Sequence, residues 1–337
     1  MPSYTRVART PLPPLTATAI GSMPHEDGFA AARCVLQALP DLPAWPQLAL
    51  PTPLAGMFAS VAAAIPGAEL GPEGTLRLPA GFPQPSKHEG FSGPPGPGEV
   101  EIAAVLGGGL HQLKKQVVGP VTLALHARLA DGRLAAHEWS TAQWFSQPVR
   151  EVARSLAAHP TRLLLLDEPD LERGLHYAQL GRTRCAHLLS TVLVGHATMV
   201  GVHCCCEPDF VFLTGLPLDV ISFDAFRYGL EAVAQSAAIG AFLDSGGEIA
   251  WGIVPANSQD LAGCTARGLA ARLARLWEAL AGRGVDATRL ARQSLITPTC
   301  GLALLTEAEA EWALQLTTAV SEELRPLAAS LGIVGVL

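Results

Sequence analysis

Three residues of the kinds that bind soft metals stand at two distant places in the sequence. His203 and Cys205 are separated by one residue, and Cys300 lies near the end of the chain. Residues i and i+2 of an extended chain point to the same side, so His203 and Cys205 can face one opening while Cys204 points into the wall. One imidazole and two thiolates suit Zn²⁺, and three protein ligands leave a fourth position open, as in catalytic zinc sites.

Other interpretations of these residues stay open, because a His-x-Cys pattern alone has low specificity. The same thiols could serve as a nucleophile or as inert packing. Cys206 and Glu207 lie close in sequence, and either could replace one of the ligands. The cysteines elsewhere in the chain fit small core residues: Cys34, Cys185 and Cys264.

Polar residues at other predicted strand ends indicate where a substrate would bind. Asp167 follows an apolar run, and we expect it to be catalytic and to accept a hydrogen bond from a substrate ammonium group. Glu168 either joins it in substrate binding, or caps the next helix or pairs with an arginine. His25 is either a surface histidine or a catalytic residue of the first loop. Trp251 either shapes the substrate site, together with Gln47, or packs in the core.

Short apolar runs predict the strands that position these residues. The predicted strands are 16–21, 44–48, 116–120, 163–167, 199–204, 220–224, 249–254 and 295–300. Most are nearly continuous in apolar residues, which is typical of parallel strands buried on both faces. The predicted helices between them include 27–38, 143–158, 181–195, 229–243, 258–282 and 306–331.

Strands that alternate with helices imply crossover connections and a parallel sheet. Eight such units predict an α/β protein with a single (β/α)₈ TIM barrel over residues 1–337, with an open doubly wound sheet as the alternative. The chemistry of such barrels lies at the C-terminal ends of the strands, where the residues above are expected. A proline- and glycine-rich excursion at about 79–98 fits a surface loop or a mobile lid.

The bulk composition narrows the class of protein. The net charge is −7, and the three lysines form no long basic run, which argues against a nucleic-acid partner. We find no run of about 20 apolar residues that would predict a transmembrane helix. The seven cysteines are an odd number, and three of them are consecutive, so we expect reduced thiols and a cytoplasmic location.

Short motifs in a fixed order resemble those of a known family. They are Ile-Gly-Ser-Met-Pro at 20–24, Val-Gly-Pro-Val-Thr at 118–122, Leu-Asp-Glu-Pro at 166–169, Gly-Val-His-Cys-Cys at 201–205, Val-Ile-Ser-Phe-Asp at 220–224 and Pro-Thr-Cys-Gly at 298–301. Together they resemble the C-terminal catalytic half of cobalamin-independent methionine synthase. That family belongs to the superfamily that also contains uroporphyrinogen decarboxylase and corinoid-linked methyltransferases.

The resemblance implies a zinc site of one histidine, two cysteines and one carboxylate. His203, Cys205 and Cys300 fall on the first three positions, and Asp224 falls where the synthases have a glutamate. The resemblance also implies that Ser22 and Asp167 hold the amino-acid part of a homocysteine-like thiol. The shorter aspartate side chain leaves the fourth ligand open.

The chain departs from the full-length synthases in two respects. They are about twice as long and carry an N-terminal barrel that helps to bind a folate donor, and they lack the triple cysteine. The chain therefore resembles short relatives whose methyl donor is a methylcorrinoid protein or another methyl carrier. We expect a zinc-dependent thiol methyltransferase. The alternatives are a metal-free enzyme like uroporphyrinogen decarboxylase and a non-catalytic barrel that holds zinc or docks a corrinoid protein.

Overall fold

The computed structural model describes residues 10–71, 73–82, 99–106, 112–157 and 161–330 of the chain. The strands are β1 (Thr16–Ala17), β2 (Ser22–Met23), β3 (Gln47–Leu48), β4 (Glu69–Leu70), β5 (Leu76–Arg77), β6 (Leu113–Val118), β7 (Thr161–Asp167), β8 (Met199–Cys204), β9 (Val220–Asp224), β10 (Glu248–Val254) and β11 (Ser294–Pro298).

The helices alternate with most of these strands. They are α1 (Gly28–Ala38), α2 (Pro53–Ala63), α3 (Glu99–Leu106), α4 (Pro120–His126), α5 (Trp139–Ala142), α6 (Ser146–Ala157), α7 (Leu171–His176), α8 (Gly181–Leu193), α9 (Phe210–Leu213), α10 (Ala225–Ala234), α11 (Ser236–Asp244), α12 (Ser258–Leu261), α13 (Ala266–Ala281), α14 (Ala287–Arg292) and α15 (Glu307–Ser330), with short 3₁₀ turns at Ala135–His137 and Gln143–Phe145.

Seven of the strands form one sheet in the order β1-β11-β10-β9-β8-β7-β6, and every pairing in it is parallel. The register brings residues from three strands level with one another: Asp167 of β7 is opposite His203 of β8, which is opposite Ser222 of β9. Since all the strands run the same way, their C-terminal ends lie at one edge of the sheet. The register therefore gathers the predicted site residues at that edge.

The predicted closed eight-stranded barrel is found only in part. The main sheet has seven strands, and its ladder is not closed between β6 and β1 in the described residues. The predicted strand 44–48 makes a single bridge, from Ala44 to Lys114, and then pairs as β3 with β2 in a separate two-stranded sheet. The predicted strand 16–21 is interrupted before Gly21, whose φ of 128° turns the chain. The observed fold is a curled parallel sheet with helices, like a TIM barrel.

Most of the predicted elements are confirmed, and their errors have local causes. Strands 199–204 and 220–224 have the bounds expected. The predicted strand 116–120 is shifted: β6 ends at Val118, and Pro120 is the first residue of α4, where a missing N–H costs nothing. The predicted helices 229–243 and 258–282 are each divided in two. The short hairpin of β4 and β5 was not predicted.

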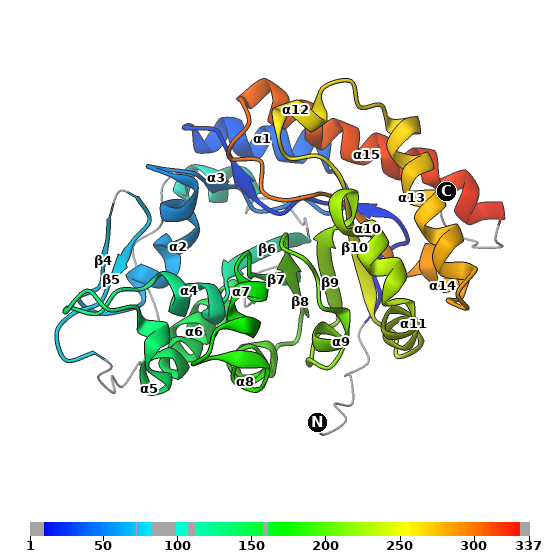
Figure 1. Ribbon diagram of the computed structural model, residues 1–337. Helices are drawn as coiled ribbons and strands as arrows, with labels where there is room; N and C mark the ends of the chain where they lie inside the picture. The colour runs from blue at the N-terminus through cyan, green and yellow to red at the C-terminus, as the bar shows by residue number, and fades with distance from the viewer. Residues whose placement is uncertain (1–9, 72, 83–98, 107–111, 158–160, 331–337) are drawn as a thin grey trace.

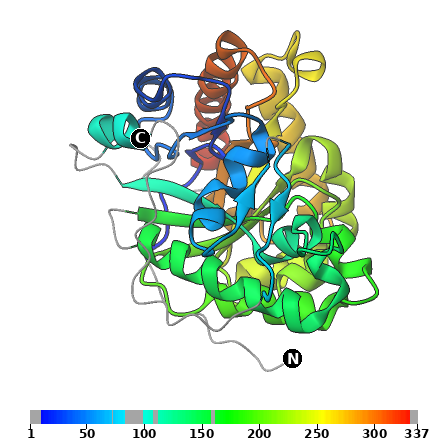
Figure 2. The same ribbon diagram turned by 90° about the vertical axis from the view of Figure 1, so that its left-hand side faces the viewer.

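The helices surround the sheet. In Figure 1 the strands β6 to β10 lie together, with α6 and α8 below them and α1 and α15 above. Figure 2 shows α2 and the β4–β5 hairpin on the side that faces the viewer. Within the described residues, none of the helices combines the length and the apolar character that a membrane span needs. Most of the predicted excursion, residues 83–98, lies outside the described part of the chain.

Candidate metal centre

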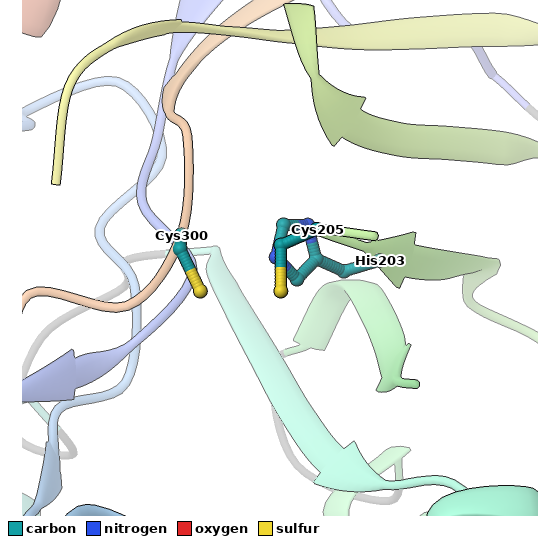
Figure 3. Close-up of side chains that lie close together, drawn as sticks. All are labelled: His203, Cys205 and Cys300. Atoms are coloured by element: carbon teal, nitrogen blue, oxygen red, sulfur yellow. The ribbon is translucent and has the colours of Figure 1, made fainter. Parts of the chain in front are cut away.

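The two distant parts of the sequence that carry histidine and cysteine meet in the structure. One ligand atom each from His203, Cys205 and Cys300 lies within 4.8 Å of the others. Cys300 comes from the segment after β11, whereas Cys205 and His203 come from the end of β8 (Figure 3). The predicted grouping of these three residues is confirmed as an arrangement of side chains that could hold a metal ion.

The imidazole of His203 is oriented by a neighbouring strand. Its Nδ1 lies 2.9 Å from the hydroxyl of Ser222, and both residues are buried. Its Nε2 is buried and has no hydrogen-bond partner among the described residues. A buried polar nitrogen without a partner is costly, and a metal ion would satisfy it. The donor set of one nitrogen and two sulfurs therefore fits Zn²⁺.

The two thiols of this group share a hydrogen bond that shifts their pKa values in opposite directions. The hydrogen bond from Cys205 lowers the pKa of Cys300 well below its usual value, and the neighbouring His203 acts in the same direction. The same hydrogen bond, together with burial, raises the pKa of Cys205. A metal ion bound to both sulfurs would take the place of their thiol protons, as metal binding to thiols does.

Asp224, the predicted fourth ligand, is placed beside this group but is not a member of it. One oxygen of its carboxylate accepts a hydrogen bond of 2.8 Å from the backbone N–H of Arg227 and caps the N-terminus of α10. Burial raises the pKa of Asp224 to about 6. Its role as a ligand stays a prediction.

Asp167 lies beside the metal group and faces an unexpected buried cation. Burial raises the pKa of its carboxyl to about 6, against the opposing effect of Lys114 and His203. The oxygen Oδ1 of Asp167 is buried and has no hydrogen-bond partner among the described residues. The predicted role of Asp167 in binding a substrate ammonium group stays a prediction.

Lys114 was not recognised as a site residue from the sequence. It is fully buried, and burial lowers its pKa to about 8 although Asp167 opposes that shift. Its ammonium group donates to the carbonyl oxygen of Ile20 and to Oε1 of Gln116, the latter at 3.1 Å. The predicted strand began at Gln116 and left Lys114 out, whereas the observed β6 begins at Leu113 and includes it.

The first loop approaches the metal group from the other side. The backbone N–H of Leu302 donates to the carbonyl of Ser22 at 2.8 Å. A Cβ added at Gly301 would lie 3.0 Å from Oγ of Ser22, so the serine lies next to the segment that carries Cys300. Nδ1 of His25 is buried and has no hydrogen-bond partner in the described part of the chain. The structure thus places Ser22 near the site, while the catalytic role of His25 is untested.

Glu168 is engaged in the fold. Its two carboxylate oxygens accept hydrogen bonds from the backbone N–H groups of Val121 and Thr122 and from the Thr122 hydroxyl, at 2.6–2.9 Å. Burial nevertheless raises its pKa to about 7. The predicted substrate-binding role of Glu168 finds no support in these contacts. These contacts agree with the alternative, that Glu168 caps a helix. The helix is α4, which comes before Glu168 in the chain, and not the next helix as predicted.

Trp251 also belongs to the packing. It is fully buried, its indole N–H donates to the Ser294 hydroxyl at 2.7 Å, and its ring makes edge contacts with Phe223 and Trp277. These contacts join the sheet to α13. The alternative interpretation of Trp251 as a core residue therefore agrees with the structure, and a role in substrate binding has no support.

Cys206, which was considered as a substitute ligand, pairs with a different cysteine. Its Sγ lies 3.2 Å from Sγ of Cys204, and neither belongs to the metal group. The pKa of Cys206 is lowered to about 7, chiefly by the hydrogen bond from Cys204. Glu207 is likewise outside the metal group.

Comparison with known proteins gives the fold but no family. No protein-family model matches the chain. No curated protein matches it in sequence.

Solved structures match over nearly the whole chain. One is a B12-independent methionine synthase from Shewanella sp. W3-18-1 in complex with selenomethionine, with 15% identity, a TM-score of 0.67, and coverage of 94% of this chain and 99% of that chain. Another is a methyltransferase from Methanosarcina mazei, with 17% identity, a TM-score of 0.54 and coverage of 94% of each chain. A GH113 β-1,4-mannanase also matches, at a TM-score of 0.44 with 10% identity, over 92% of this chain and 99% of that chain. At 15% and 17% identity, the likeness to the synthase and the methyltransferase shows a shared fold.

Proposed function

We propose that the chain is a single-barrel, zinc-dependent methyltransferase that transfers a methyl group to a thiol acceptor of the homocysteine type. The observation that carries the proposal is the buried Nε2 of His203, which has no oxygen or nitrogen partner among the described residues and lies in one group with two thiols. This group stands at the C-terminal edge of a TIM-barrel-like sheet, where enzymes of that fold have their active sites.

Three residues would hold the metal, and a fourth is a weaker candidate. His203, Cys205 and Cys300 supply the ligand atoms. One oxygen of Asp224 already accepts a backbone hydrogen bond, so we propose that its carboxylate is a weaker ligand than the thiols. When bound there, Zn²⁺ would convert an acceptor thiol, whose usual pKa is about 8.5, into the more nucleophilic thiolate at neutral pH.

Two buried acceptor atoms without partners suit the ammonium end of an amino-acid thiol. Oδ1 of Asp167 and Oε1 of Gln47 are both buried and without hydrogen-bond partners in the described residues. An ammonium group offers three donors, and a carboxylate binds it by a charge-assisted hydrogen bond. We propose that Asp167 anchors this group, with Gln47 and Ser22 near it, and that His25 is a further catalytic residue.

The protein's main contribution to the rate would be orientation. The anchor holds the amino-acid end of the acceptor on one strand, while its sulfur is held on neighbouring strands. Fixing both ends removes rotational freedom before the methyl group is transferred, and such positioning lowers the barrier of a two-reactant step. The methyl donor that we propose is a methylcorrinoid protein or another methyl carrier.

The structural comparisons support methyl transfer more than the alternatives. Two solved structures with TM-scores above 0.5 are described as a methionine synthase and a methyltransferase. A metal-free enzyme of the decarboxylase type gives no reason for His203 Nε2 to lie unpaired beside two thiols. A non-catalytic barrel that holds zinc or docks a corrinoid protein would not need the unpaired acceptors of Asp167 and Gln47.

The deciding experiment is a methyl-transfer assay on the purified, zinc-loaded chain. Homocysteine and simple thiols are each paired with methylcobalamin, a methyl-folate and a simple alkyl donor, and the methylated thiol is measured by mass spectrometry. We expect methylation of homocysteine with at least one donor, and its loss in Cys300→Ser. Stoichiometric zinc without methylation of any thiol would favour the non-catalytic alternative.

A further inference from the structure

The three consecutive cysteines are divided between two faces of the chain. Cys205 joins the metal group together with His203, because residues two apart on an extended segment point the same way. Cys204 and Cys206 point to the opposite side, where their sulfur atoms lie 3.2 Å apart. The segment therefore carries two thiol sites, and the zinc proposal uses only one of them.

We propose that Cys204 and Cys206 form an oxidisable dithiol, which hydrogen peroxide or another hydroperoxide converts to a disulfide. The two sulfur atoms are closer to each other than ordinary van der Waals contact. They need to approach by only about 1.2 Å to reach the length of a disulfide bond, about 2.05 Å. Cys204 is buried at the end of β8, whereas Cys206 is half-buried and accessible to a small oxidant. Cys206 can thus react with the oxidant, while Cys204 lies beside it to complete the disulfide.

The reaction balances with the peroxide as the oxidant. The sulfur of Cys206 attacks one peroxide oxygen, the O–O bond breaks, and a sulfenic acid and the first molecule of water are formed. The sulfur of Cys204 then attacks the sulfenic sulfur, the S–O bond breaks, and the oxygen leaves with the two remaining protons as the second molecule of water. The two thiols together lose two electrons, and the peroxide gains them.

The disulfide would act on the metal group through the residue between its two sulfurs. A bond from Cys204 to Cys206 closes a small ring that contains the backbone of Cys205, so its formation must change the direction of the Cys205 side chain. His203 and Cys300 would then face a displaced thiol. This consequence rests on the proposed zinc site, whereas the disulfide itself does not.

The test is one equivalent of hydrogen peroxide on the full chain as purified. Free thiols are then counted after denaturation, and the disulfide is mapped on the peptide released by trypsin and cleavage at Met199. We expect the count of free thiols to fall by two, from seven to five, with Cys204 joined to Cys206 and with dithiothreitol restoring all seven. A disulfide between Cys205 and Cys300, or no disulfide at all, would overturn the proposal.

Two serine variants complete the test. Cys206→Ser removes one partner at a half-buried position and should keep all six of its thiols after peroxide, because the pair is broken. Cys264→Ser removes another half-buried thiol, which donates to the carbonyl of Asp260, and should still lose two. Zinc release is followed in parallel. If the disulfide forms without zinc release, the dithiol stands and its proposed effect on the metal group is wrong.

Discussion

The hydroxyl of Ser222 lies 2.9 Å from Nδ1 of His203, and the two residues are register partners on β8 and β9. Because this contact occupies one ring nitrogen, it leaves Nε2 as the atom directed at the two thiols. Second partners of this kind fix the tautomer and the orientation of a metal-binding histidine. The strand register, which is set by the buried apolar residues of the sheet, thereby decides which nitrogen is offered to a metal.

We predict that Ser222→Ala weakens zinc binding by about 10–100-fold, the usual effect of removing the second partner of a metal-binding histidine. The measurement is a competition titration against a chromogenic chelator. Ser236→Ala, which removes a buried hydroxyl on α11, serves as the control and should leave the affinity unchanged. Equal affinities for Ser222→Ala and the wild type would show that the hydroxyl does not orient the imidazole.

Asp167→Asn should weaken the binding of homocysteine without loss of zinc. The substitution keeps the shape of the side chain and removes its charge, and a hydrogen bond to a charged group contributes roughly 1.5–3 kcal/mol. Since about 1.4 kcal/mol corresponds to a factor of ten, we expect a loss of about tenfold or more. The test is calorimetry with homocysteine and with a thiol that lacks the amino group. If the two thiols lose affinity equally, Asp167 does not bind the ammonium group.

The same carboxyl predicts a pH dependence. Burial raises the pKa of Asp167 from 3.8 to about 6, so the carboxylate that would pair with an ammonium group is fully formed only above that pH. The ratio of the affinities for homocysteine and for the thiol without an amino group should therefore rise as the pH passes through about 6. Titrations from pH 5 to pH 8 measure this ratio, and a flat profile would contradict the assignment.

The ionisation of Asp167 affects the stability of the fold in the opposite direction to its effect on substrate binding. A pKa raised by folding means that the folded chain holds the proton more tightly than the unfolded chain does. The contribution of Asp167 to the free energy of unfolding is therefore present below pH 3.8 and is lost as the pH rises to about 6. Ionisation of the proposed anchor therefore lowers the stability of the fold, as is common for groups at functional sites.

Lys114→Met should weaken homocysteine binding by making Asp167 harder to ionise. The buried ammonium group lowers the pKa of Asp167, so its removal should shift the midpoint of the affinity ratio to a pH above about 6. Lys115→Met is the matched control, because this lysine lies over the ring of Trp45 at 4.9 Å and is adjacent on the same strand. An unchanged midpoint in Lys114→Met, with zinc content equal to that of the wild type, would remove Lys114 from the site.

Much of the sheet could be predicted because its strands are buried on both faces. The strands that contain His203 and Asp224 are mostly apolar and carry a polar residue at or near their C-terminal end, so both the element and its end could be predicted. The first strand was less predictable: β1 ends at Ala17, although the predicted strand continued to Gly21. At Gly21 the side chain of Gln116 lies 2.0 Å from the place where a Cβ would be, a contact between segments that are distant in sequence.

The parts of the site set by sequence spacing could be predicted, whereas the parts set by contacts between distant strands could not. The i and i+2 relation of His203 and Cys205 follows from an extended chain alone. The hydrogen bonds of Glu168 to α4 and the burial of Lys114 depend on which strands become neighbours, and the local sequence does not contain that information. Trp251 was expected at a strand end, but it lies in the middle of β10, and its ring packs against Phe223 and Trp277.

Residues from two distant parts of the chain make the proposed catalytic zinc site, and metal content tests that site most directly. Elemental analysis is applied to the freshly purified chain, prepared without chelators, and to Cys205→Ser, Cys300→Ser and the control Cys264→Ser. We predict one zinc per chain in the wild type and in Cys264→Ser, and the loss of most of it in the other two variants. Wild-type protein that contains no metal, or variants that retain it in full, would contradict the account.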